Sequence, residues 1–352
     1  MIEDNPAEEN IYVENNVIQN NLIKIVFNNK YHISSIYDKT ENREVLTDEA
    51  NVMQVFEDYP REYDAWEITD YYKQKMWIAD DVSCVEVLKN GLEITRKYQK
   101  SVIKQKITLK PDSKRIDFNT YVDWHEDHVL LKAAFPVDIR TDFATYDIQF
   151  GNLTRPTHRN TGWDEAKFEV CAHKWADLSE TNYGVSLLND CKYGYSTEGN
   201  IIKISLLKAA TYPNPEADRG KHTFTYSLLP HTGNVYQGKT ITEGYLLNMP
   251  LEATKICANN GKLPSEFSIA SSDKNNVIIE TIKKAENDNS IILRAFETFN
   301  SKTTANITVE FNFKKVYLCD MLENNQKELT FSENTVSVPF KNFEINTLKF
   351  II

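Results

Sequence analysis

The chain has 352 residues, of which 41 % are hydrophobic and 26 % are charged, a composition typical of a globular protein with one large core or two smaller ones. Its formal net charge of -11 argues against nucleic acid or an anionic membrane as a partner. No segment approaches 18 uncharged apolar residues and the acidic start MIEDNPAEEN lacks a hydrophobic core, so neither a membrane span nor a signal peptide is predicted.

The first half of the chain alternates short apolar runs with polar turns. Residues 1–10 are expected to form a flexible, solvated leader. NNLIKIVFNN (20–29) has the two-residue period of a strand and is bounded by asparagine pairs. Two further strands join across Asn90-Gly91, a strong hairpin signal. The stretch 102–124 repeats this form, with a turn at its Pro-Asp pair.

The second half continues in the same way. IIKISLL (201–207) and HTFTYSLL (222–229) are two more expected strands. No helix pattern is sustained apart from a weak candidate at 165–170, a stretch that β-pairing explains equally well. The stretch 259–276 is rich in Ser, Asn and Gly and marks a break. Six short apolar runs follow it, which suit a small terminal β-sandwich.

Regularly spaced short strands without helical crossovers predict an all-β protein with antiparallel pairing, as a sandwich or a barrel-like sheet. The break divides it into a large β-domain, residues 11–258, and a small one, residues 266–352. The five cysteines are scattered, odd in number and without a C-x-x-C pair. They predict reduced structural thiols and a cytoplasmic location.

Local motifs leave the chemistry undecided. The sequence contains no P-loop, G-x-G-x-x-G, H-E-x-x-H or nucleophile elbow. His125-Glu126-Asp127-His128 follows an expected strand and superficially resembles a metal site. Two histidines three residues apart in a β-turn rarely converge on one ion, so a polar turn is the preferred interpretation.

The segment 150–195 is dense in Arg, His, Trp, Asp and Asn. Such groups bind sugar hydroxyls and cover the apolar faces of sugars. The alternative is a long connection between sheets, held by side-chain hydrogen bonds. The residues themselves leave both interpretations open.

Four long motifs carry a resemblance to a known family. They are VDWHEDHVLLKAAFPVDI (122–139), GNLTRPTHRNTGWDEAKFEV (151–170), AHKWADLSETNYGVSLLND (172–190) and YPNPEADRGKHTFTYSLLPH (212–231). They resemble, in order, the β-sandwich half of glycoside hydrolase family 38 α-mannosidases of the cytosolic and bacterial type. The resemblance extends over nearly all of residues 15–352 and includes FEDYPREYDAW (56–66).

The resemblance implies a galactose-mutarotase-like supersandwich followed by a small terminal β-sandwich domain. It also implies the C-terminal region of a zinc-dependent, retaining α-mannosidase. In that family an aspartate nucleophile, a second carboxylate and the zinc ligands belong to an N-terminal catalytic α/β domain. We therefore expect no catalytic or metal-binding residue and no cofactor in this chain. We expect the chain to serve as scaffold and active-site rim and to be inactive alone.

The expected partners are that N-terminal catalytic domain, a mannoside or oligosaccharide substrate, and in addition a second copy of the chain in a homo-oligomer. The alternative function is a stand-alone carbohydrate-binding or interaction module. An epimerase-like activity is suggested by the fold alone, and no catalytic His/Glu pair supports it.

Five residues are the candidates for the substrate rim or a domain interface: Arg155, His158, Asp177, Lys208 and Asp218. The alternative for each is a buried, hydrogen-bonded structural role. Lys208 stands where relatives usually carry arginine, and lysine offers a mobile point charge instead of a rigid fork.

Aromatic and turn residues give two further expectations. Trp163 and Trp175 are expected to be core anchors more readily than sugar-stacking groups. Tyr31-His32 occupies an early turn where relatives often have glycine, so a tight turn with positive φ is not assured there.

Overall fold

The computed structural model of this protein describes residues 10–255, 261–262 and 264–352. The chain forms two compact units, Met1–Asp147 with Leu153–Leu251, and Ile148–Asn152 with Glu252–Ile352. The predicted leader at 1–10, apart from its last residue, lies outside the described residues, as does the predicted domain limit at 258.

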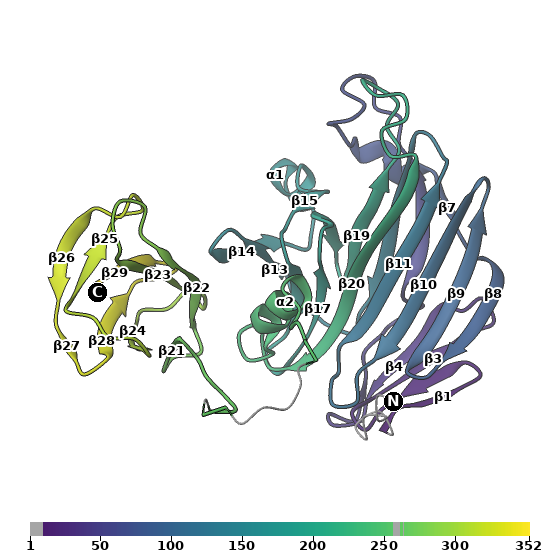
Figure 1. Ribbon diagram of the computed structural model, residues 1–352. Helices are drawn as coiled ribbons and strands as arrows, with labels where there is room; N and C mark the ends of the chain where they lie inside the picture. The colour runs from purple at the N-terminus through teal and green to yellow at the C-terminus, as the bar shows by residue number, and fades with distance from the viewer. Residues whose placement is uncertain (1–9, 256–260, 263) are drawn as a thin grey trace. The chain divides into compact units, whose positions relative to one another are not determined.

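The first unit contains three antiparallel sheets (Figure 1). A five-stranded sheet at the N-terminal end has its strands in sequence order. It comprises β1 (Tyr12–Glu14), β2 (Val17–Gln19), β3 (Ile23–Phe27), β4 (Ile33–Asp38) and β5 (Arg43–Glu44).

The second sheet has nine strands in the order β14-β13-β16-β17-β20-β11-β10-β9-β8, and its long strands lie side by side in Figure 1. It comprises β8 (Asp81–Leu88), β9 (Gly91–Tyr98), β10 (Ser101–Leu109), β11 (Ile116–Trp124), β13 (Phe143–Ile148), β14 (Gly151–Pro156), β16 (Trp175–Ser179), β17 (Tyr183–Asn189) and β20 (Gly220–Thr232).

The third sheet has six strands in the order β15-β18-β19-β12-β6-β7. It comprises β6 (Val52–Glu57), β7 (Met76–Ile78), β12 (Val129–Pro136), β15 (Val170–Cys171), β18 (Gly194–Glu198) and β19 (Ile201–Lys208). One hydrophobic core draws on all three sheets, with Ile25, Phe118 and Phe135 among its fully buried members. Burial of apolar area on this scale is the main stabilising force of the unit.

Two burial patterns distinguish the strands. β10 and β11 alternate between buried and more exposed residues, because each presents one face to the core and the other to solvent. β12 and β17 are buried at every position. β17 contacts helix α2 (Thr240–Asn248), where Gly244 lies so close to Trp175 that an added Cβ would be 2.9 Å from that ring.

Two turns show how local chemistry shapes the unit. The predicted hairpin across Asn90-Gly91 is confirmed, since Leu88 pairs with Gly91. A Cβ on Gly91 would lie 2.0 Å from the Ile107 carbonyl oxygen, so glycine is required by the close approach of β10. Tyr31 adopts a φ of +56° although it is not glycine. The buried Arg96 donates a 2.7 Å hydrogen bond to its carbonyl oxygen.

The second unit is a small sandwich of a four-stranded sheet, β21-β24-β28-β27, and a five-stranded sheet, β22-β23-β29-β25-β26. The six predicted strands are present, together with three that were not predicted, β21, β26 and β27. The strands are β21 (Ala270–Ser272), β22 (Val277–Lys284), β23 (Ile291–Glu297), β24 (Thr303–Val309), β25 (Lys315–Cys319), β26 (Asn325–Leu329), β27 (Phe331–Ser332), β28 (Thr335–Phe340) and β29 (Ile345–Ile351).

The all-β prediction, a supersandwich followed by a small β-sandwich, is confirmed. The helix candidate at 165–170 is wrong in position, because α1 (Gly162–Glu165) ends where that helix was expected to begin. Thr161 caps α1 by accepting a hydrogen bond from the Asp164 amide, and Val170 belongs to β15. Within the described ranges, no helix has the length and apolar character needed to cross a bilayer.

Candidate functional site

Three strands of the six-stranded sheet place their ends together. β6 ends at Glu57, β12 begins at Val129 and β19 ends at Lys208. Val129 pairs with Glu57, and Leu130 pairs with Lys208, so the three ends lie at the same edge of the sheet. The loops 58–75 and 209–219 leave the sheet at this edge, as the blue and green loops at the top of Figure 1 show. We call this region the rim.

A buried ion pair joins the start of the 58–75 loop to the end of β19. Lys208 Nζ binds the Oδ2 atom of Asp58, and the Asp58 side chain is 1 % exposed. The Asp58 amide donates a 2.8 Å hydrogen bond to the His128 carbonyl oxygen, which fixes the start of the loop. Burial raises the pKa of Asp58, and the bond from Lys208 opposes this shift. The Oδ1 atom of Asp58 has no hydrogen-bond partner among the described residues.

A second carboxylate ties the two rim loops together. Asp64 Oδ2 accepts hydrogen bonds from the amides of Thr211, at 2.7 Å, and Tyr212, at 3.2 Å. His128 Nε2 lies 3.1 Å from the Thr211 hydroxyl, and His128 Nδ1 lies 3.6 Å from Asp64 Oδ1. The loops are therefore held by a polar network and not by chain connectivity alone.

Tyrosines line a hollow of about 540 Å³ on the rim, formed by Glu57, Tyr59, Tyr71, Tyr72, Gln74 and Lys75. The Tyr59 ring lies 4.3 Å from the His128 ring, and the Tyr71 hydroxyl donates to the Tyr59 carbonyl oxygen at 3.2 Å. Lys75 Nζ donates to a Glu57 carboxylate oxygen at 2.6 Å. The hollow thus combines aromatic faces with a carboxylate, an amide and an ammonium group.

The 3-10 helix η2 (Asp70–Gln74) contributes one buried and one exposed tyrosine to the hollow. Tyr72 is buried, packs edge-on against Phe56 and donates a 2.6 Å hydrogen bond to Glu169. Tyr71, the preceding residue, is 39 % exposed. Anchoring of Tyr72 therefore positions Tyr71 at the hollow.

Beneath η2, the outer face of the six-stranded sheet carries buried charge. Lys132 Nζ binds Glu169 and donates to the Ser196 hydroxyl at 2.8 Å, and its side chain is fully buried. Lys203 lies on the same face and places its Nζ 5.4 Å from the Phe56 ring. Burial, aided by the charge of Lys132, lowers the pKa of Lys203 to about 8.

Two of the five predicted candidates lie at the rim. Lys208 forms the ion pair with Asp58, and Asp218 lies in the 209–219 loop with its carbonyl oxygen 2.7 Å from His222 Nε2. Burial raises the pKa of Asp218, while the charges of His222 and Lys192 oppose the shift.

The other three candidates lie elsewhere in the first unit. Arg155 is on β14, with its guanidinium 4.7 Å from the centre of the Tyr146 ring. His158 follows in the next loop, 3.8 Å from Asp164. Asp177 is buried on β16 and accepts from Ser186, at 2.7 Å, and lies 2.8 Å from His231 Nε2. Within the described ranges, no hydrogen bond or ion pair joins any two of the five candidates.

The two tryptophans that the sequence singles out lie in different environments. Trp163 is 83 % exposed on α1, so its prediction as a core anchor is wrong, because the short helix projects away from the sheet. Trp175 is 1 % exposed and is a core residue, as predicted.

The four residues of the His125–His128 turn contact different partners and do not converge on one point. His125 lies 2.9 Å from Asp123, and Glu126 accepts from the Ser101 hydroxyl at 2.8 Å. Asp127 pairs with Arg219, and His128 contacts Thr211. Over residues 10–255, 261–262 and 264–352, no group of three or more His, Cys, Asp or Glu side chains is arranged to hold a metal ion.

Sequence reasoning missed the rim tyrosines Tyr59 and Tyr71 and the aspartates Asp58 and Asp64 of the 58–75 loop. Tyr59 and these two aspartates lie within FEDYPREYDAW (56–66), which carried part of the family resemblance. The aromatic and acidic density of that segment was a usable signal. What the sequence did not show is that this loop meets residue 211, nearly 150 positions further along the chain.

Cys191 offers a test of the electrostatics around the first unit. Partial burial, reinforced by Asp190, raises the pKa of its thiol to about 11. Because the thiolate is the nucleophile, we expect iodoacetamide at pH 8 to alkylate Cys191 at least about 10-fold more slowly in the native protein than in urea, where the pKa is near 8.5. Peptide mapping by mass spectrometry measures both rates. Equal rates in the two states would contradict the raised pKa.

Comparison with protein families gives two matches. Residues 18–216 match the family 38 C-terminal domain of glycosyl hydrolases, and residues 276–348 match the family 38 C-terminal beta sandwich domain. Apart from Ile148–Asn152, which belong to the small unit, the first match falls in the large unit, and the second match falls in the small unit.

Curated relatives extend over almost the whole chain. Alpha-mannosidase G of Dictyostelium discoideum is 37 % identical over 370 residues, covering 99 % of this chain and 33 % of that protein. Alpha-mannosidase 2C1 of Homo sapiens is 34 % identical over 349 residues, covering 95 % of this chain and 33 % of that protein. This chain therefore spans about a third of the length of these relatives.

A solved structure shares the fold. The crystal structure of an alpha-mannosidase from Enterococcus faecalis V583 superposes with a TM-score of 0.78 at 16 % identity, covering 95 % of this chain and 42 % of that chain. At this identity the likeness concerns the fold alone.

Proposed function

The chain belongs to glycosyl hydrolase family 38, whose C-terminal domains it matches, and from this premise we propose that it forms the scaffold and part of the substrate rim of an α-mannosidase. The proposal assigns the hydrolytic groups to an N-terminal catalytic α/β domain of the same enzyme. It assigns to the rim a share in binding the mannoside or oligosaccharide.

The tyrosine-lined hollow carries the proposal. Sugars present apolar C–H faces that stack on aromatic rings and hydroxyls that need hydrogen-bond partners. Tyr59 is 62 % exposed, so its ring is accessible, and Tyr71 lies beside it. Glu57 and Gln74 supply acceptor and donor groups in the same hollow. Its volume of about 540 Å³ is in the range of small-molecule sites.

The zinc ion implied by the family resemblance does not fit the residues described here. A zinc site in a protein uses three or four converging His, Cys or carboxylate ligands. The described part of the chain offers no such group. We therefore derive no step through zinc for this chain and propose that the metal is held by the catalytic domain.

Hydrolysis of an aryl α-mannoside tests the division of labour. We expect this polypeptide, with zinc added, to give no turnover above buffer. The positive control is an α-mannosidase of the same family assayed with the same substrate. Robust turnover by this polypeptide alone would overturn the proposed assignment of hydrolysis to another domain.

Replacing Tyr59 by alanine tests the rim. In an α-mannosidase carrying this region, we expect Tyr59→Ala to raise KM for an oligomannoside about 3- to 10-fold with little change in kcat, because a stacked aromatic contributes about 0.5–1.5 kcal/mol. The Tyr71 hydroxyl bonds the main-chain oxygen of Tyr59, so this contact survives the substitution. Tyr193→Ala is the matched control, since Tyr193 is a half-exposed tyrosine outside the hollow. An unchanged KM in Tyr59→Ala would remove the hollow from the substrate site.

A stand-alone carbohydrate-binding module is the second candidate, because the whole hollow is built from this chain. Calorimetric titration of the chain with mannose oligomers distinguishes the two functions. Saturable heat that disappears in Tyr59→Ala would favour the module. No heat, together with a raised KM in the longer enzyme, would favour the rim.

A further inference from the structure

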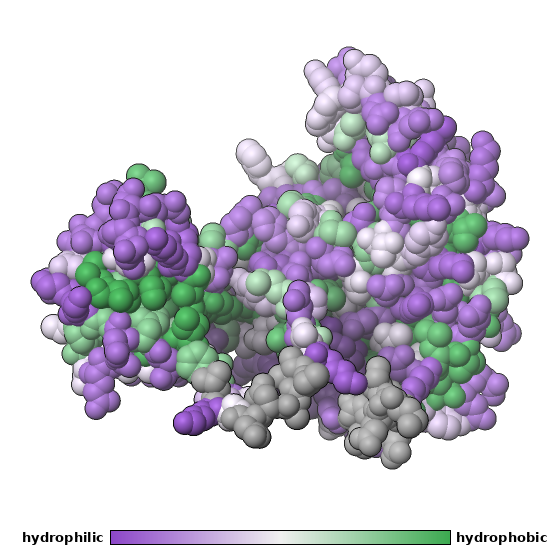
Figure 2. Space-filling model, viewed as in Figure 1, coloured by the Kyte–Doolittle hydropathy of each residue, from purple (hydrophilic) through white to green (hydrophobic). Residues whose placement is uncertain are grey.

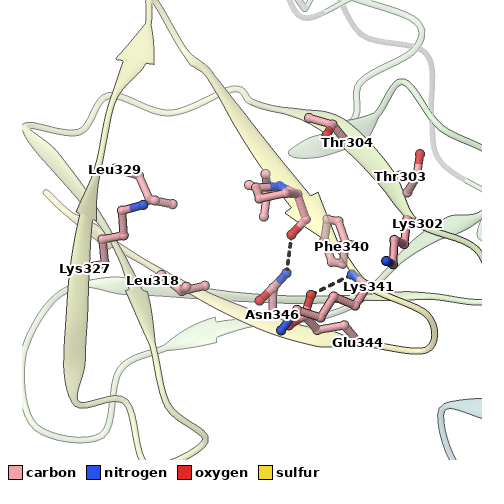
Figure 3. Close-up of a pocket in the computed structure, with 12 residues that line it drawn as sticks. Lys302, Thr303, Thr304, Leu318, Lys327, Leu329, Phe340, Lys341, Glu344 and Asn346 are labelled. Carbon is pink, nitrogen blue, oxygen red and sulfur yellow. Dashed lines mark hydrogen bonds between the residues drawn. The ribbon is translucent and has the colours of Figure 1, made fainter.

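The small unit contains a cleft of about 500 Å³ that is independent of the rim. It opens where β26 with its neighbour β25 faces β24 and β28 of the other sheet (Figure 3). Leu318, Leu329, Val338 and Phe340 form its apolar lining. Val338 and Phe340 are core residues of the sandwich, so the floor of the cleft is the end of the hydrophobic core.

Three lysines, Lys302, Lys327 and Lys341, surround this apolar floor. All three are exposed, and within the described ranges none of them has an ion-pair partner. Figure 3 shows Lys302 and Lys341 on one side of the cleft and Lys327 on the other. With three lysines and one glutamate, the lining of the cleft carries a net positive charge, although the chain as a whole has a net charge of -11.

The polar groups deeper in the cleft are already engaged. Glu344 accepts a 2.7 Å hydrogen bond from the Lys341 amide, and its carboxylate is thereby held by the main chain. Asn346, 7 % exposed, donates a 3.1 Å hydrogen bond to the Pro339 carbonyl oxygen. The three lysine ammonium groups thus outnumber Glu344, the one carboxylate of the lining, and the hydroxyls of Thr303 and Thr304 are further polar groups there.

Part of the outer surface of the same unit is also apolar. Figure 2 shows a continuous hydrophobic belt on the viewed face of the small unit, between two polar zones. Leu322 and Phe331, 79 % and 42 % exposed, are among the apolar residues that this unit leaves open to solvent. Contiguous exposed apolar surface is typical of sites that bind a ligand or a partner.

We propose that the cleft binds an amphipathic carboxylate, with its apolar body against Leu318, Leu329 and Phe340 and its carboxylate among the three lysines. The apolar floor excludes a purely hydrophilic anion such as inorganic phosphate as the preferred ligand. The three unpaired ammonium groups favour a negative head group over a neutral or cationic one. The site lies wholly in the small unit and does not rest on the proposed mannosidase function.

Calorimetric titration of the full chain with decanoate tests the proposal. The matched ligands are decanol and decyltrimethylammonium, which have the same chain length with a neutral and a positive head. We expect saturable binding of decanoate at a stoichiometry of one, weakened by added salt, and affinities for the other two ligands lower by about 10-fold or more. Equal affinity for all three, or no saturable heat with decanoate, would refute the proposal.

Charge-removing variants locate the site. In the triple variant Lys302→Gln/Lys327→Gln/Lys341→Gln we expect about a 10-fold loss of decanoate affinity, because each exposed charge pair contributes a few tenths of a kcal/mol to about 1 kcal/mol. Lys284→Gln, an exposed lysine of the same unit outside the cleft, is the control and should bind as the parent does. These residues are exposed, so the fold is expected to survive, which thermal unfolding verifies. Unchanged binding in the triple variant would place the ligand elsewhere and overturn the assignment.

Discussion

Replacing Glu169 by glutamine is expected to lower the free energy of unfolding by about 3–5 kcal/mol, because it leaves Lys132 as an uncompensated buried charge. Lys132 is fully buried, and Glu169 is the carboxylate that binds its ammonium group. Burial already lowers the pKa of Lys132, and the charge of Glu169 opposes that shift. Without the carboxylate the lysine must either stay charged without a partner or lose its proton on folding.

Urea denaturation at pH 7 measures this change as a lower midpoint with an unchanged m-value. Glu165→Gln is the control, an exposed glutamate four residues earlier, and should shift stability by less than about 0.5 kcal/mol. The double variant Lys132→Met/Glu169→Gln should recover most of the loss, since an apolar replacement removes the buried charge. A full loss in the double variant would mean that the ion pair is not the cause.

Most of the fold follows from the sequence because its strands carry their own signals. The hairpin at Asn90-Gly91 is a local property, since the turn chemistry and the two-residue period agree. β26, with the sequence NQKEL, was missed because four of its five residues are exposed. Its strand conformation comes from pairing with β25, which a local pattern does not reveal.

The features that the sequence did not predict depend on segments that pack together from distant parts of the chain. β12 contains Lys132 within a fully buried strand, and η2 with residues 168–169 covers this face. From the sequence alone, Lys132 is simply a lysine within an apolar strand. Its burial can be inferred only when the segment that covers this face of the sheet is known. The rim likewise depends on contacts between residues far apart in sequence, such as Asp58 and Lys208. Neither residue has a local pattern that identifies its partner.

Asp38 forms a second buried ion pair, with Lys114. Asp38→Asn should lower the free energy of unfolding by about 3 kcal/mol. The carboxylate is fully buried and accepts hydrogen bonds from Lys114 Nζ, at 2.7 Å, and from the Tyr183 hydroxyl, at 2.8 Å. Thr40 adds a hydroxyl bond of 2.8 Å and an amide bond of 3.0 Å. An asparagine in this place cannot accept all of these bonds and leaves the Lys114 ammonium without its counter-charge.

The effect of Asp38→Asn should depend on pH in a defined direction. Burial raises the pKa of Asp38, but the bonds from Lys114, Thr40 and Tyr183 together lower it below its usual value near 3.8. A depressed folded-state pKa contributes stability that is present above the unfolded-state value and is lost as pH falls through the folded-state pKa. Unfolding measured between pH 7 and pH 2.5 should therefore show the parent and Asp38→Asn converging below about pH 4. Asp112→Asn, an exposed aspartate in the β10–β11 turn, should follow the parent throughout. A constant gap across this range would show that the variant acts through packing and not through the charge of Asp38.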